Sequence, residues 1–224
     1  MIGRLDHVAL GVADLDEAAA RWTQQFGLAE RARTAARVDL ACDDEDVALA
    51  LEPVAGAAEL GHRYVAWRLA KDITLDDAAA RLAAHGAPCE REGDALVTQD
   101  VEGNAIRLLP YRAPADRRVA HARPAGPAGL RPGHPRKLGH VNFLTGRIHE
   151  QVDFYTNVLG LVLTDWLGED GVWLRPAGGS EHHALAFVNK GYGHLHHVAL
   201  DLVDIGQMRD ALDHLGRCGR WLGW

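Results

Sequence analysis

Histidine is the residue type in this chain best suited to chemistry, and its distribution is uneven. The 224 residues contain 13 histidines, and nine of these follow residue 133. His140 and His197 each stand at the start of a short apolar stretch, His-Val-Asn-Phe and His-Val-Ala-Leu. Neutral imidazoles that converge on one point can bind a divalent first-row metal ion. The second half of the chain is therefore where we expect a metal site.

An internal repeat tells which elements must position these histidines. Shifted by 133 residues, Leu-Asp-His-Val at 5–8 aligns with Leu-Gly-His-Val at 138–141, and Phe-Gly-Leu at 26–28 aligns with Leu-Gly-Leu at 159–161. Repeats of this kind indicate two copies of one structural unit. We predict a first module at 1–112, a linker rich in Pro, Ala, Gly and Arg at 113–136, and a second module at 137–224.

Each module reads as a pair of βαβββ units, which predicts an α+β fold: a curved mixed sheet with helices outside. Asp14 and Glu17 are spaced as a capping box that begins the first helix. Gly27 and Gly160 stand where a helix ends in a left-handed turn. We expect strands at 5–12, 29–34, 37–42, 47–53, 64–69, 87–92, 95–100 and 104–110, then at 138–145, 161–167, 171–175, 183–189 and 196–202, with later helices at 75–85 and 206–215.

The repeat also predicts that the two histidines meet. His140 and His197 are 57 residues apart, each near the start of the first strand of a βαβββ unit, and His7 and Tyr64 hold the same places in module one. Strands related by a pseudo-twofold axis lie side by side, so inward side chains at equivalent positions converge. A third ligand at the place of Arg107 would fall near position 240, beyond Trp224.

The sequence resembles the vicinal oxygen chelate superfamily, and within it the type I two-domain extradiol ring-cleavage dioxygenases. The resemblance covers nearly the whole chain. It rests on Gly-His-Val-Asn at 139–142, His-His-Ala-Leu-Ala at 182–186 and Leu-His-His-Val-Ala at 195–199. Module one keeps the turn of the family's third ligand at 100–104, but Arg107 stands where the family has Glu. Module one therefore resembles the family's metal-free N-terminal module.

The resemblance implies cleavage of a substituted catechol by O₂ beside the diol, at a mononuclear Fe(II). Mn(II) suits the same two histidines and one carboxylate. His140 and His197 would be the metal ligands, and His183 would move protons between substrate and product.

Position alone suggests the pocket around that site. Trp173 and Phe187 are candidates for its apolar wall, and Asn142 and His194 for its polar rim. Strand alternation should turn His182 and His196 to the opposite faces of their strands, which favours structural roles for both.

The second module ends before the strands that correspond to 87–110 in the first, so we expect it to be incomplete at its C-terminus. Two histidines without the carboxylate should hold iron weakly. Residues 1–224 by themselves are therefore expected to show little activity.

Charge and hydropathy argue against two classes of partner, nucleic acids and membranes. A net charge of −7 and a pI near 6.0 argue against nucleic-acid binding, and no apolar run approaches membrane-spanning length. Cys42, Cys89 and Cys218 are too scattered for a disulfide framework or zinc site, as expected for reduced thiols in a cytoplasmic protein. By resemblance, the full-length protein would form a homo-oligomer.

Two other functions remain open. One is a metal-dependent isomerase or lyase of the glyoxalase type on the same scaffold, against which Tyr64 and Arg107 count, because such sites usually draw ligands from both modules. The other is a metal-free protein that binds a small molecule.

Overall fold

The computed structural model describes residues 1–114, 133–221 and 223, and these form two compact units. Unit 1 consists of Met1–Ala9, Gly61–Ala113 and Gly139–Ala199, and unit 2 of Leu10–Leu60, Pro114–Leu138 and Leu200–Trp224. Most of the predicted linker, at 115–132, lies outside the described residues. No helix of the described part is both long and apolar enough to span a membrane.

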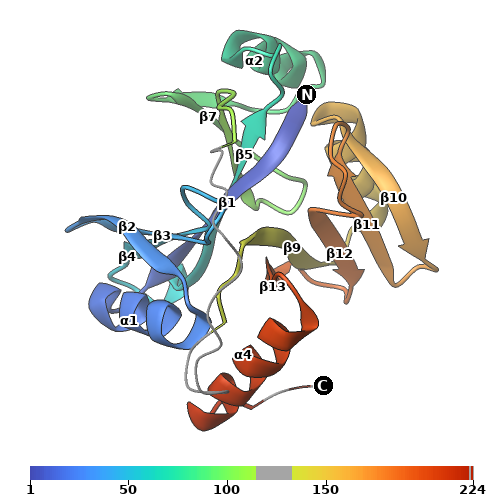
Figure 1. Cartoon of the computed structure of the whole chain (residues 1–224). Coiled ribbons are helices and arrows are strands. Elements are labelled where there is room, and N and C mark those ends of the chain that lie inside the picture. The colour runs from blue at the N-terminus through green and yellow to red at the C-terminus, as the bar shows by residue number, and fades with distance from the viewer. Residues whose placement is uncertain (115–132, 222, 224) are drawn as a thin grey trace. The chain divides into compact units, whose positions relative to one another are not determined.

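Unit 1 contains the second half of module one (Figure 1). Its strands follow the hydrogen-bonded order β1-β5-β8-β7-β6. β5 and β8 are parallel, whereas β7 is antiparallel to both β8 and β6. The elements are β1 (Ile2–Val12, as far as Ala9 in this unit), β5 (Gly61–Leu69), α2 (Leu75–Ala84), β6 (Glu90–Glu92), β7 (Ala95–Gln99) and β8 (Ala105–Leu109).

Unit 1 also contains most of the sheet that carries the histidines, with the strand order β10-β11-β12-β9-β13, β9 from Gly139 onward and β13 as far as Ala199. β12 runs parallel to β9, with Ala186 opposite Asn142 and Phe187 opposite Phe143. The elements are β9 (Lys137–Thr145), α3 (Ile148–Asp153), η2 (Phe154–Val158), β10 (Leu161–Leu167), β11 (Gly171–Pro176), β12 (Leu185–Asn189) and β13 (His194–Asp201).

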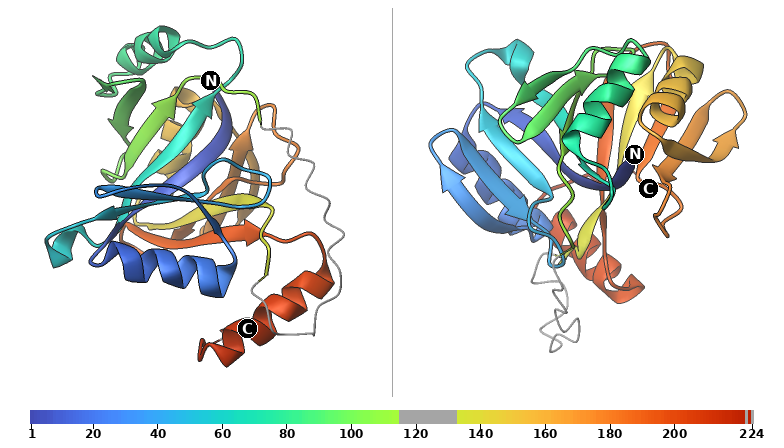
Figure 2. Two further views of the ribbon diagram at one scale, coloured as in Figure 1. Left: turned by 60° about the vertical axis from the view of Figure 1, so that its left-hand side comes forward. Right: turned by 90° about the horizontal axis from the view of Figure 1, so that it is seen from above.

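Unit 2 contains the antiparallel strands β2-β3-β4 and two longer helices, which are drawn in blue and in red (Figure 2). The imidazole of His214 on α4 contacts the carbonyl oxygen of Gln24 on α1, with 2.8 Å between Nε2 and O. The elements are α1 (Leu15–Phe26), β2 (Ala29–Thr34), β3 (Arg37–Ala41), β4 (Leu49–Pro53), η1 (Ala57–Glu59) and α4 (Ile205–Arg217).

The α+β prediction is confirmed, with the expected strands and helices in their expected order. Asp14 begins α1 by accepting the backbone N–H of Glu17, and Gly27 ends it with φ +74°. The capping box is only half formed, because the Glu17 carboxylate pairs with Arg21 on the next turn. Exposed on the helix surface, Glu17 finds a charged partner there, and charge-assisted hydrogen bonds are the stronger kind.

A π-helical turn interrupts the helix that follows β9. α3 changes into the π-helix η2 at Phe154, and η2 buries Phe154, Tyr155 and Val158. The ring of Tyr155 lies 5.4 Å from that of Phe187 on β12. Because π-turns add one residue to the helical repeat, they re-aim the side chains that follow. This turn supports the histidine-bearing sheet from its helix-covered side.

The carboxylate of Asp100 joins the turn before β8 to this helical segment. Its Oδ1 accepts the backbone N–H groups of Glu102 and Asn104, both at 2.9 Å. Its Oδ2 accepts the side-chain amides of Asn104 at 2.8 Å and Gln151 at 3.0 Å. The hydroxyl of the fully buried Tyr155 also hydrogen-bonds to Asp100, and burial, followed by that negative charge, raises the pKa of the phenol.

Neighbouring contacts strengthen this connection. Glu102 Oε1 accepts the backbone N–H of Gly146 at 2.9 Å, and Arg147 donates to the carbonyl oxygen of Val101 at 2.7 Å. We call residues 100–104 with Gln151 and Tyr155 the Asp100 clamp. It connects the turn at residues 100–104 to the helical segment that follows β9.

Replacing Tyr155 with Phe should lower the free energy of unfolding by about 2 kcal/mol, because it removes a buried hydrogen bond to a charged group while keeping the ring. Urea unfolding measures the change. Tyr111→Phe is the matched control, since Tyr111 is 41% exposed. Equal stability of the two variants would contradict the role of the clamp.

Candidate metal centre

His140 and His197 meet in unit 1, on the adjacent strands β9 and β13. Their Nε2 atoms are 3.0 Å apart, and their rings cross at 71° with centroids separated by 5.2 Å. Both side chains are half-buried. The repeat predicted this convergence from equivalent positions on paired strands, and the structure brings the two imidazoles together.

The separation of the two nitrogens suits ligands of one metal ion. A metal–imidazole bond is about 2.1 Å long, so two such bonds at right angles place their nitrogens about 3.0 Å apart. In the metal-free protein the same distance suits a hydrogen bond between one N–H and one lone pair. The two histidines therefore fit neighbouring corners of an octahedral site.

Within the residues that the structure describes, no three His, Cys, Asp or Glu side chains gather closely enough to hold a metal ion together. The equivalent positions in module one are filled by other pairings. Arg107 lies over the Tyr64 ring at 4.4 Å and donates to Glu92 at 2.9 Å. His7 Nδ1 contacts Asp6 Oδ2 at 2.8 Å.

The environment keeps the paired imidazoles neutral, as metal ligation requires. Burial lowers the pKa of His140, and the nearby His183 and His197 contribute to the same shift. Together they bring this pKa to about 4. Burial and the neighbouring His196 lower the pKa of His197. Protonation would place a charge on a partly desolvated ring that has other imidazoles beside it.

His183 joins the pair. It lies just before β12, half-buried, with its ring centroid 4.3 Å from that of His140. The backbone of the following residue, Ala184, still bridges β9 and β11 by hydrogen bonds. At this distance an imidazole can exchange a proton with a molecule bound beside His140.

Trp173 and Asn142 lie on the same face of the sheet. Trp173 on β11 pairs with Ala186 on β12, which pairs with Asn142 on β9, so all three project to one side. The Trp173 ring is 6.4 Å from the His183 ring. Asn142 is 7% exposed, and its buried Oδ1 accepts no hydrogen bond from the described part of the protein. A buried oxygen of this kind can accept a hydrogen bond from a water molecule or another bound molecule.

Phe187 does not belong to this face, which corrects its expected place in the pocket wall. It is fully buried opposite Phe143, and its ring packs against Phe143 and Tyr155. The register explains the difference, because Phe187 follows Ala186 and side chains alternate along a strand. Its position among apolar residues reflects packing of the helix-covered core.

His194 is exposed and stands three residues before His197, so alternation turns it away from the paired imidazoles. Its electrostatic neighbour is His62, whose ring packs edge-on against Phe143 at 4.9 Å. This corrects the expectation that His194 lies on the polar rim with Asn142.

His196 is the residue that strand alternation misjudged. Its Nδ1 lies 2.7 Å from Nδ1 of His197, so its ring turns back toward its neighbour. His182 behaves in the same way toward His183, with 3.0 Å between the Nδ1 atoms. The only signal in the sequence was that two histidines stand together twice.

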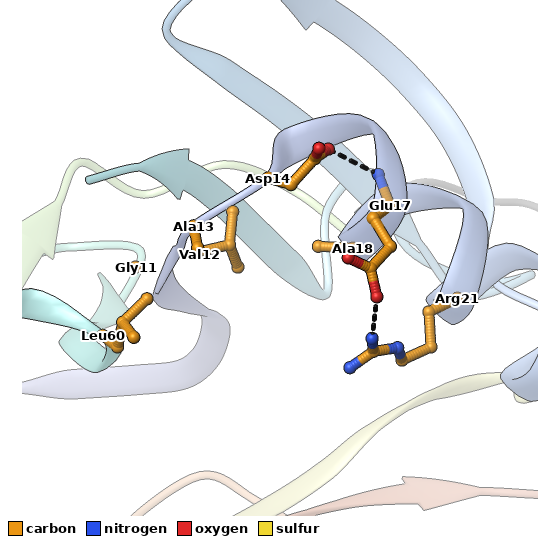
Figure 3. A pocket seen from close by; sticks show the side chains of 8 residues that line it. All are labelled: Gly11, Val12, Ala13, Asp14, Glu17, Ala18, Arg21 and Leu60. Atoms are coloured by element: carbon orange, nitrogen blue, oxygen red, sulfur yellow. Dashed lines mark hydrogen bonds and ion pairs between the residues drawn. The ribbon is translucent and has the colours of Figure 1, made fainter. Parts of the chain in front are cut away.

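A separate hollow of about 260 Å³ lies wholly in unit 2, at the beginning of α1 (Figure 3). It contains the Asp14 cap and the Glu17–Arg21 ion pair, and none of the predicted site residues. Its lining is Gly11, Val12, Ala13, Asp14, Glu17, Ala18, Arg21 and Leu60.

The profile of the Glyoxalase/Bleomycin resistance protein/Dioxygenase superfamily matches the chain twice, at residues 4–108 and 137–220. The chain belongs to this superfamily. The two matches coincide with the two halves of the internal repeat, and the second contains His140, His183 and His197.

Known proteins resemble this chain in sequence or in fold. Metapyrocatechase 2 of Cupriavidus necator is 29% identical over 238 aligned positions, which cover 98% of this chain and 72% of that protein. The Mn(II)-bound glyoxalase of Novosphingobium aromaticivorans superposes with a TM-score of 0.82 at 22% identity, covering 100% of this chain and 73% of that one. The 2,3-dioxygenase LapB of Pseudomonas sp. KL28 gives 0.79 at 22% identity, covering 97% and 81%. At these identities the two structures establish a shared fold.

His62 should make stability depend on pH. Burial, aided by His194, lowers the pKa of His62 to about 4, from an ordinary value of 6.5. Below pH 6.5 the unfolded chain therefore binds a proton at this residue, whereas the folded protein does not bind it until about pH 4. The free energy of unfolding falls as the pH decreases through this window.

Replacing His62 with Leu should make the protein less sensitive to acid, by about 1–2 kcal/mol of unfolding free energy at pH 5 relative to pH 7. Urea titrations at the two pH values measure this. His85→Leu, at an exposed position after α2, is the control. The explanation fails if the two variants lose stability equally between pH 7 and pH 5.

Proposed function

We propose that this protein is an extradiol dioxygenase that opens the ring of a substituted catechol beside its diol. Both atoms of O₂ enter the product, a ring-opened semialdehyde or related keto acid. His140 and His197 would hold Fe(II), or Mn(II) in its place, together with a glutamate from outside the described residues. The 3.0 Å separation of the two Nε2 atoms, with a third imidazole beside them, carries the proposal.

The similar proteins support the same proposed function. The similar curated protein is named for catechol cleavage, and one structure with this fold is a 2,3-dioxygenase. The motif Leu-His-His-Val-Ala at 195–199 and the fourteen-residue spacing from His183 to His197 agree with the family pattern.

The bound metal would supply three open positions, so that the diol and O₂ are held side by side. His183 would take a proton from a hydroxyl of the catechol and return it as the ring opens. An imidazole suits both transfers, because its ordinary pKa lies near neutrality. The ring centroid of His183 lies 4.3 Å from that of His140, and this closeness supports the proposed role of His183 as proton acceptor.

Two other side chains would position the substrate. The buried Oδ1 of Asn142 would accept a hydrogen bond from the substrate or from a water molecule held with it. Trp173, 6.4 Å from His183, would offer an apolar surface to the aromatic ring. Phe187 and His194 have no part in this proposal.

A glyoxalase-type isomerase is the second candidate, because the Mn(II)-bound glyoxalase has the same fold over the whole chain. Such an enzyme needs no O₂, so anaerobic turnover separates the two activities. Cytoplasmic location and assembly into a homo-oligomer remain predictions.

The main test uses the protein as encoded by its natural gene, loaded anaerobically with Fe(II) and mixed with substituted catechols in air. We expect a yellow product, O₂ consumption and one ring opened per O₂ consumed. His183→Ala should retain iron and lower kcat about 100-fold or more, the usual range for a lost acid–base group. His140→Ala should lose iron.

Metal analysis beside each assay makes the result decisive. Iron-loaded protein that develops no colour with several catechols would overturn the dioxygenase proposal, and turnover of a hemithioacetal without O₂ would favour the isomerase. Full activity of His183→Ala would remove His183 from the mechanism. His85→Ala, exposed and distant in sequence from every site residue, controls for purification losses.

A further inference from the structure

Both ring nitrogens of His197 are engaged by other histidines. Its Nε2 lies 3.0 Å from Nε2 of His140, and its Nδ1 lies 2.7 Å from Nδ1 of His196. The His196 and His197 rings are tilted by 65°, with centroids 4.9 Å apart. A chain of three imidazoles thus runs from β9 through the end-strand β13 of this sheet.

Each nitrogen–nitrogen contact requires one N–H donor and one lone pair. A neutral imidazole has one of each, so the state of one contact of His197 determines the other. If Nδ1 of His197 donates to His196, its Nε2 has a free lone pair. If His196 donates instead, Nε2 of His197 carries the proton and cannot bind a metal ion.

We propose that His196 is a positioning residue that accepts the Nδ1–H of His197 and so holds His197 in the tautomer and ring orientation that metal binding needs. This rests on the proposed function, because it takes His140 and His197 as the metal ligands. His140 then donates through Nε2 in the metal-free protein and only has to move its own proton to Nδ1 when metal binds.

The proposed hydrogen-bond acceptor of His197 is of an unusual kind. The second ring nitrogen of a metal-bound histidine commonly donates to a carboxylate, a backbone carbonyl or water. Here the acceptor is the preceding residue of the same strand, and its imidazole is exposed. Because both residues stand on one strand, the acceptor moves with the ligand that it orients.

The chain offers a matched control in its second His-His pair. His182 contacts His183 through the same two atoms at 3.0 Å, and His182 is likewise exposed. His183 has no ligand role in the proposal. Removing the imidazole of His182 should therefore leave metal affinity unchanged, whereas removing the imidazole of His196 should weaken it.

The test measures Mn(II) affinity by the loss of the free-ion signal in electron paramagnetic resonance, using the natural gene product without substrate. His196→Phe keeps the ring and removes the acceptor, and should weaken binding about 10–100-fold, the usual effect of losing such a partner. His196→Asn should restore affinity to within about threefold of the unaltered protein, because its Oδ1 branches from Cγ as Nδ1 does. His182→Phe should bind Mn(II) normally.

A second readout separates positioning from general damage. Long-range ¹H–¹⁵N spectra of the metal-free protein should show His197 protonated at Nδ1 in the unaltered protein and in His196→Asn, and a mixture of tautomers in His196→Phe. The melting temperature should be the same in all three, because His196 is exposed.

The possible failures are distinguishable. If the unaltered protein does not bind Mn(II), or if His140→Ala binds it equally well, the metal site and this inference fall together. If His140→Ala loses Mn(II) while His196→Phe retains normal affinity, only the role of His196 is overturned. Equal weakening by His182→Phe and His196→Phe would also overturn it, because the effect would then not depend on His197.

Discussion

The approach of two imidazole nitrogens to within 3.0 Å is the constraint on which the rest of this site depends. Two basic nitrogens with no proton between them would repel, so the contact exists either as a hydrogen bond or as a pair of ligands around a cation. Burial disfavours protonation of either imidazole. Because both rings stay neutral, they come together without charge repulsion. Everything else near the site orients these rings or stands beside them.

The turn at residues 100–104 has a structural role. The Asp100 carboxylate satisfies donors of its own turn and also those of Gln151 and Tyr155, and Tyr155 packs on Phe187 behind the histidine-bearing sheet. A buried carboxylate with this many hydrogen bonds is stable only when all its partners are present. The polar groups of this turn therefore connect elements from the two halves of the repeat, while Arg107 lies over the Tyr64 ring.

Consecutive histidines would let one strand supply a proposed metal ligand and the residue that orients it. Strict alternation would separate His196 from His197, and the same holds for His182 and His183. At the end-strand of a sheet and just before a strand, however, backbone constraints from neighbours are weaker, and adjacent rings can turn toward each other. Under the proposal for His196, the acceptor beside the ligand needs no second element to position it.

The sequence by itself determined the repeat, the α+β architecture, the convergence of His140 and His197 and the position of helix ends such as Asp14 and Gly27. These depend on local periodicity, on capping and on the equivalence of two copies, all of which are carried by residues close together or at a constant offset. Only the tertiary structure decided that Phe187 faces the helix-covered core, that His194 lies by His62 and that His196 turns toward His197. Those outcomes depend on strand register, on a π-turn that adds one residue to a helix and on rotamers at a sheet edge, and each is set by packing between segments far apart in the chain.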